Sequence, residues 1–301
     1  MPVGKKDIFF FQLILLKTFI ILYRTGDIFI CVNVIVIASQ KGGVGKTTAA
    51  INLSYSMANK GYRVVLIDTD SQGSVGHSLS RNTKKRYGFY DAILGEVSFE
   101  ELIINTKLPN YHIITAGYQS DLIDEHQIDI NNFSNKVRLL FQGLNAQEVD
   151  FVVVDTSAGI GAITSSIIKQ STTIIIPQQA EPLGVRSVPQ VLKKILGIRR
   201  EGSKINVAGI LMTMVNSQLR ECVEAESQLR SVLPPSIMFQ TSIPRDNVFL
   251  RASSLGVPVG LLSKNPLPAA IVFDQVVAEL EIKLGISNIS TQENGIKGLL
   301  D

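Results

Sequence analysis

A glycine-rich stretch between an apolar run and a helical pattern offers the clearest chemistry in this 301-residue chain. Residues 41–48 read KGGVGKTT and follow the apolar run 33–38. Three of them are glycines, namely Gly42, Gly43 and Gly45. Glycines let the backbone turn several N–H groups toward one anion, and the start of a helix adds its positive dipole end. The stretch therefore predicts a phosphate-binding loop.

The side chains around these glycines suit a nucleotide triphosphate and its metal ion. Lys46 is placed to reach the β- and γ-phosphates, and the Thr47 hydroxyl is placed to bind Mg²⁺. Val44 and Thr48 complete the set of loop residues that we expect to contact the nucleotide. The predicted ligands are a nucleoside triphosphate and Mg²⁺.

Acidic residues follow two further apolar runs. Asp68 and Asp70 come directly after residues 64–67, and Asp155 comes directly after residues 151–154. The carboxyl ends of parallel strands meet at one sheet edge, where ligands bind. We expect Asp70 to orient an attacking water, and Asp68 and Asp155 to hold the Mg²⁺ shell together with Thr47.

Strands and helices alternate along the chain. Strands are expected at 33–38, 64–67, 111–115, 151–154, 172–176 (stopped by Pro177) and 205–212, and helices at 47–60, 132–143, 185–198, 219–232 and 268–284. This alternation predicts an α/β fold with a mostly parallel twisted sheet and helices on both faces. We expect one domain over residues 33–285, followed by a polar tail at 286–301.

The loop resembles the deviant Walker A loop of the ParA/MinD ATPases, and later segments match that family in order. Lys41 matches the signature lysine, which in the family crosses a dimer to the partner's phosphates. The resemblance implies a P-loop NTPase fold and catalytic roles for Lys41, Lys46 and Asp70. The chain departs from the usual patterns in several places: Gln40 replaces the first loop glycine, Ser71 replaces a proline, and Arg251 replaces a glutamate.

Two later segments resemble the parts of the family that contact the adenine base. Residues 205–217 resemble the strand that reaches the base, and this implies a contact from Asn216. Residues 243–247 resemble the segment on the other side of the base, and this implies a contact from Pro244. For Asn216, an ordinary turn residue remains the alternative.

The net charge of the chain is too small to predict a general electrostatic attraction to DNA. It has 29 Lys and Arg against 26 Asp and Glu, and outside residues 1–32 the balance is 25 against 24. The positions that match nucleoid-binding arginines hold Gln218 and Val248 instead. Three nearby arginines are the candidate DNA contacts, namely Arg220, Arg245 and Arg251.

The first 32 residues differ in composition from the rest. The run 8–23 is strongly apolar but contains Gln12 and Lys17, and it is short for a membrane span. Three interpretations stay open: a weak membrane anchor, an extension packed on the body, or a mis-annotated start with the true one near Val32. The tail 286–301 has no basic face and is a poor membrane helix.

The resemblance implies an ATPase that dimerises on binding ATP, hydrolyses it slowly, and positions a chromosome, a plasmid or another cargo. A ParB-like protein would stimulate hydrolysis, and non-specific DNA is a possible partner. Two cysteines without local partners favour a reducing, cytoplasmic location, with or without nucleoid association. The alternatives are a membrane-associated site-selection ATPase of the cell-division or flagellar-number kind, and a nucleotide-gated adaptor.

Overall fold

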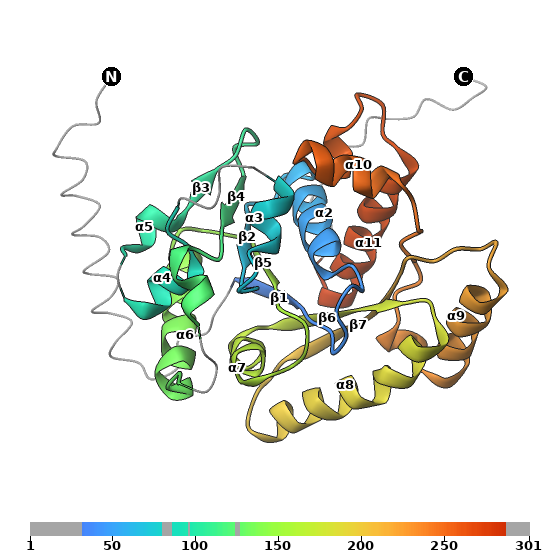
Figure 1. Ribbon diagram of the computed structural model, residues 1–301, viewed down its shortest axis with the longest axis horizontal. Helices are drawn as coiled ribbons and strands as arrows, with labels where there is room; N and C mark the ends of the chain where they lie inside the picture. The colour runs from blue at the N-terminus through green and yellow to red at the C-terminus, as the bar shows by residue number, and fades with distance from the viewer. Residues whose placement is uncertain (1–31, 80–85, 96, 124–126, 287–301) are drawn as a thin grey trace. The chain divides into compact units, whose positions relative to one another are not determined.

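The computed structural model describes residues 32–286 apart from 80–85, 96 and 124–126. All of these belong to one compact unit that begins at Val32. Within them, seven strands form one sheet in the order β3-β4-β2-β5-β1-β6-β7 (Figure 1). The strands are β1 (Asn33–Ile37), β2 (Val64–Asp68), β3 (Ile104–Asn105), β4 (Tyr111–Ile114), β5 (Phe151–Asp155), β6 (Thr173–Gln179) and β7 (Asn206–Thr213).

Neighbouring strands run parallel except β3, which pairs antiparallel with β4. The central strands are apolar and buried on both faces, as strands covered by helices on each side require. This confirms the predicted α/β class.

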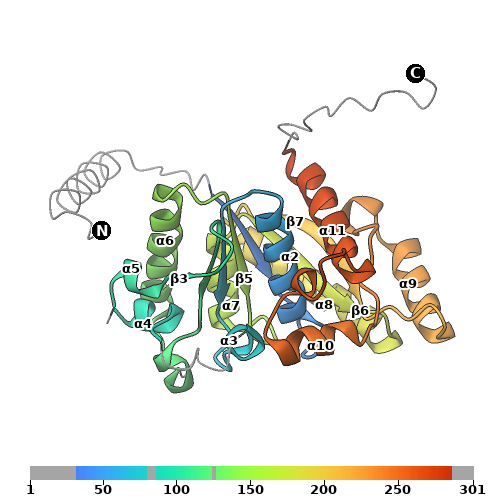
Figure 2. The same cartoon turned by 90° about the horizontal axis from the view of Figure 1, so that it is seen from above.

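Helices cover both faces of the sheet. The helices are α2 (Lys46–Asn59), α3 (Ser74–Leu79), α4 (Phe89–Leu94), α5 (Phe99–Leu102), α6 (Ile130–Ala146), α7 (Ala162–Gln170), α8 (Pro182–Arg200), α9 (Arg220–Val232), α10 (Val248–Leu255) and α11 (Pro268–Leu284). The described residues also form the short 3₁₀ turns η2 (Tyr118–Leu122), η3 (Pro235–Ile237) and η4 (Val259–Leu261). Helices α2 and α11 pack together on one face, and α6, α7 and α8 pack in a row on the other (Figure 2).

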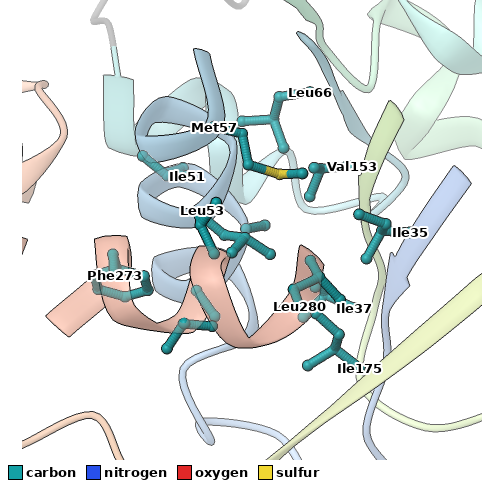
Figure 3. Packing of buried hydrophobic residues seen from close by; sticks show 14 of the residues in the cluster. Ile35, Ile37, Ile51, Leu53, Met57, Leu66, Val153, Ile175, Phe273 and Leu280 are labelled. Atoms are coloured by element: carbon teal, nitrogen blue, oxygen red, sulfur yellow. The ribbon is translucent and has the colours of Figure 1, made fainter. Parts of the chain in front are cut away.

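The largest core cluster lies between the sheet and the α2–α11 pair. Leu53 and Met57 of α2, Phe273 and Leu280 of α11 and the sheet residue Ile35 all belong to this cluster (Figure 3). Because α2 is buried against both the sheet and α11, the loop at its start is held on a rigid support.

The expectation that Pro177 ends a strand is wrong. Strand β6 continues to Gln179, and Pro177 pairs in register with Leu211 of β7. On its other side, β6 is paired by β1 only as far as Ile175, whose carbonyl accepts from Ala38. Residues 175 and 177 direct their backbone N–H and C=O groups to the same side of β6, toward β1. Because β1 pairs with β6 only as far as Ile175, an N–H at position 177 would have had no strand partner, and proline is tolerated there.

The apolar run 8–23 and most of the tail lie outside the described residues. Among the helices that are described, none is long and apolar enough to cross a membrane.

The packing of α11 gives a stability test. Leu280 is 1% exposed in the core, whereas Ile282 in the same helix is 79% exposed. We expect Leu280→Ala to lower the free energy of unfolding by about 2–5 kcal/mol, because it removes buried apolar contacts and leaves a cavity. Ile282→Ala is the matched control and should change it by less than about 0.5 kcal/mol. Urea denaturation measures both, and equal effects would contradict the assigned core.

Candidate nucleotide-binding site

The glycine-rich loop leaves β1 and enters α2 through two left-handed residues. Gly43 and Gly45 have φ values of 72° and 85°, a conformation that other residues adopt at a cost. The first hydrogen bond of α2 runs from the Ala49 N–H to the Gly45 carbonyl at 2.8 Å. The N–H groups that precede it at the helix start have no partner within the helix, and no side chain caps them. This end of α2 is therefore suited to an anion.

Lys46 lies inside the loop that it would serve. Its side chain is almost fully buried, and its Nζ is 3.5 Å from the carbonyl oxygen of Lys41. Burial lowers the pKa of the Lys46 ammonium, and the nearby carboxylates of Asp155 and Asp70 partly oppose that shift. A phosphate at this point would supply the negative charge that the buried ammonium lacks.

Two buried carboxyls face the loop from neighbouring strands. Asp68 and Asp155 end β2 and β5 and are partners in register. Both are fully buried. Burial raises the pKa of Asp68 to about 7, and burial together with the Asp68 charge raises the pKa of Asp155 well above its usual value.

The oxygens of these two carboxyls differ in the hydrogen bonds that they accept. The Thr47 hydroxyl donates to Asp155 Oδ2 at 2.7 Å, while Asp155 Oδ1 is buried without a partner among the described residues. Asp68 accepts from the Asp70 N–H at 3.1 Å and from the Val75 N–H at 2.9 Å. Oxygen ligands of this kind are those that Mg²⁺ prefers. The free Asp155 Oδ1, the Thr47 hydroxyl and the two buried carboxyls fit a divalent cation, whose charge would favour their ionised form.

Asp70 sits in the loop after β2, close enough to interact electrostatically with Lys46, Asp68 and Asp155. Its carboxylate accepts from the Gln72 N–H at 3.0 Å and from the Ser74 hydroxyl at 3.4 Å. The side chain is partly exposed, so it is accessible to a water molecule at the sheet edge.

Lys41 is held by a residue that sequence reasoning missed. Its ammonium forms an ion pair with Glu181, which directly precedes α8. Both side chains are partly exposed, at 39% and 28%. The one available signal was that Glu181 follows the carboxyl end of β6, at the same sheet edge as the loop.

The two segments expected near the base lie side by side. The Val215 N–H donates to the Ile243 carbonyl at 3.0 Å, and the Arg245 N–H donates to the Val215 carbonyl at 2.9 Å. The Thr213 hydroxyl joins them to the phosphate loop by donating to the Val44 carbonyl at 2.8 Å. The structure thus brings Asn216 and Pro244 together beside the loop. Asn216 also makes a local turn, since its Oδ1 accepts from the Gln218 N–H at 3.0 Å.

The three candidate DNA-contacting arginines are exposed near this end of the molecule. Arg220 pairs with Glu224 one helical turn later, at 2.6 Å, and its side chain is 86% exposed. Arg245 directly follows Pro244, and Arg251 lies on α10. The Arg220 charge is therefore partly balanced within its own helix.

The raised pKa values give a pH-dependent prediction. A carboxyl with a higher pKa in the folded chain holds its proton more tightly there, so it destabilises the fold as pH rises above its unfolded value. We expect Asp155→Asn to raise the melting temperature of the nucleotide-free chain at pH 8, with the gain shrinking toward pH 4. Calorimetry across this range measures the effect.

Asp129→Asn is the control, because Asp129 is the N-cap of α6 and asparagine caps equally well. A gain at Asp155→Asn that does not depend on pH would contradict the electrostatic explanation.

Comparison with known proteins places this site in a family. A family model described as an AAA domain matches residues 32–238. The chain is 28% identical to the chromosome partitioning protein ParA of Caulobacter vibrioides over 231 residues, covering 75% of this chain and 86% of the relative. It is 26% identical to the sporulation initiation inhibitor protein Soj of Bacillus subtilis over 247 residues, covering 80% and 96%.

Solved structures show the same fold. The ATP complex of McdA from Cyanothece aligns with a TM-score of 0.72 at 19% identity, covering 86% of this chain and 99% of that one. The cell division ATPase MinD of Pyrococcus furiosus aligns with a TM-score of 0.64 at 20% identity, covering 83% and 98%. The chain therefore belongs to the ParA/MinD family of ATPases with a deviant Walker A loop.

Proposed function

We propose that this chain is an ATP-driven dimerising switch that positions DNA, and that slow hydrolysis resets it. The observation that carries the proposal is the cluster at the carboxyl edge of the sheet. There, an uncapped helix start, the buried Lys46 ammonium and the unpartnered Asp155 Oδ1 lie around one loop. Each of these groups lacks a partner that a magnesium nucleotide would supply.

Each residue of the site has a role in this proposal. Residues 42–48 cradle the phosphates of ATP, and Lys46 neutralises them. Thr47 and Asp155 bind Mg²⁺, which when bound neutralises phosphate charge. Both Asp68 oxygens already accept backbone N–H groups, so Asp68 acts on the outer shell of the ion. The Asn216 amide and the Pro244 segment hold the base.

Asp70 and Lys41 act in hydrolysis and dimerisation. Asp70 orients the attacking water, because its carboxylate is partly exposed and is held by the loop after β2. Lys41 leaves Glu181 and reaches the phosphates bound by the second subunit. Its charge there stabilises the dimer and the transition state.

The curated relatives support DNA as the cargo, since those cited above include a chromosome partitioning protein. Exposed arginines at 245 and 251 offer phosphate contacts beside the base segments. A stimulating protein of the ParB kind would speed the reset of the switch.

Variants of Asp70 and Lys41 test the proposed cycle of dimerisation and hydrolysis. We expect Asp70→Ala to remain an ATP-bound dimer with turnover lowered at least about 100-fold, because water is no longer oriented. Lys41→Ala should bind ATP but stay monomeric. Size-exclusion chromatography with light scattering, in ATP and in ADP, measures both.

Lys46→Ala provides the baseline, since it should lose nucleotide binding altogether. An Asp70→Ala chain that stays monomeric in ATP would overturn the role assigned to Asp70.

The DNA cargo is tested by co-sedimentation with non-specific DNA, with and without ATP. We expect ATP-dependent binding, and we expect Arg245→Glu combined with Arg251→Glu to weaken it and to reduce its salt dependence by about two phosphate contacts. Lys193→Glu combined with Arg200→Glu, at two exposed α8 positions, is the charge-matched control. Binding to anionic liposomes instead of DNA would favour the site-selection alternative, and an equal effect of the control would reject the two arginines.

A further inference from the structure

A second concave site lies far from the nucleotide site. A groove of about 610 Å³ opens between α8, the start of β7, η3 and the end of α11; we call it the α8–α11 groove. Its lining residues are Leu192, Ile195, Leu196, Arg199, Asn206, Val207, Ala208, Ser236, Ile237 and Lys283. A volume of this size is in the range of small-molecule sites.

The groove and the phosphate loop lie at opposite ends of one strand. Asn206, which begins β7, lines the groove, whereas Thr213, which ends β7, bonds to the phosphate loop. Eight extended residues place these ends about 23 Å apart. A ligand in the groove would therefore not occupy the nucleotide site.

The walls of the groove are mostly apolar. Leu192, Ile195 and Leu196 form one stripe of α8, and Leu196 is 51% exposed at the rim. On the β7 side, Gly209 has a φ of 147°, and a Cβ there would lie 3.1 Å from the Ile237 backbone. The glycine thus lets η3 approach β7 closely.

Two cations line this apolar groove, and backbone carbonyls fix them in place. Arg199 Nε donates to the Ile205 carbonyl at 2.8 Å, and Lys283 Nζ donates to the Ser236 carbonyl at 2.7 Å. The Lys283 ammonium also lies 5.2 Å from the centre of the Phe239 ring. Within the described chain, neither cation forms an ion pair with a carboxylate.

Lys283 is partly buried, and Glu279 is the carboxylate that acts on its ammonium. Burial lowers the pKa of its ammonium, and Glu279 opposes that shift only in part. The outer guanidinium nitrogens of Arg199 have no hydrogen-bond partner among the described residues, so they are available to an anion. An anionic group between these cations would gain charge-assisted hydrogen bonds.

We infer that the α8–α11 groove binds a small apolar molecule that carries one carboxylate. The apolar part would contact Leu196, Val207 and Ile237, and the carboxylate would lie between Arg199 and Lys283. Apolar walls with a few fixed polar groups are the usual composition of such sites. This inference is independent of the proposed dimer cycle.

The test uses decanoate as the probe and the full chain with saturating ATP. Isothermal titration calorimetry should show one decanoate per chain, with no competition by ATP. The neutral analogue decanol should bind at least about tenfold more weakly, because it cannot pair with the two cations. Arg199→Gln combined with Lys283→Gln should weaken decanoate binding at least about tenfold and leave decanol binding unchanged.

Lys193→Gln combined with Arg200→Gln is the matched control, since both are exposed α8 residues that do not line the groove. Leu196→Asp is a second variant, which should abolish decanoate binding because it places a negative charge in the apolar wall. Since Leu196 is 51% exposed, the fold should be preserved, and an unchanged melting temperature would verify this. Equal binding of decanol and decanoate, loss of binding in the control, or displacement of decanoate by ATP would each overturn the inference. Failure of dimerisation would leave it intact.

Discussion

The structure around the loop depends on the electrostatic repulsion between two buried carboxyl groups, those of Asp68 and Asp155. Asp68 and Asp155 are brought together by the register of β2 with β5, and neither is exposed. Like charges so placed are costly, and the cost is met by proton retention or by a cation. Lys46 and the Thr47 hydroxyl, both from the start of α2, are the nearest compensating groups. Their positions follow from the packing of α2 between the sheet and α11.

Under the proposed function, Glu181 competes with bound phosphates for the ammonium group of Lys41. In the single chain, the charge of Lys41 is neutralised by the Glu181 carboxylate, which directly precedes α8. A partly exposed pair of this kind is worth at most about 1 kcal/mol, so it is easily exchanged for the stronger charge of a triphosphate. Under the proposed function, the pair keeps the loop lysine ordered without holding it strongly.

Local patterns were enough to predict the loop, the acids that end β2 and β5, and the parallel sheet. The loop is contiguous in sequence, and carboxyl ends of parallel strands share an edge, so Asp68 and Asp155 could be placed without coordinates. Glu181 could not be paired with Lys41, because 140 residues separate them. The continuation of β6 past Pro177 depends on where β1 stops, and the α8–α11 groove is formed by four elements distant in sequence. Such features follow from tertiary packing rather than from local preference.

The burial of α2 on nearly all sides has a consequence for how a bound nucleotide is sensed. Because this helix is fixed between the sheet and α11, the phosphate end of the site cannot shift relative to the body. Under the proposed function, a response to the γ-phosphate would then pass through segments other than α2. The turn after Asp70 and Glu181 at the start of α8 both act on lysines of the loop, since Asp70 interacts electrostatically with Lys46 and Glu181 pairs with Lys41. Under the proposed function, these two segments would carry the response to a bound nucleotide, and α2 would be the fixed support beside them.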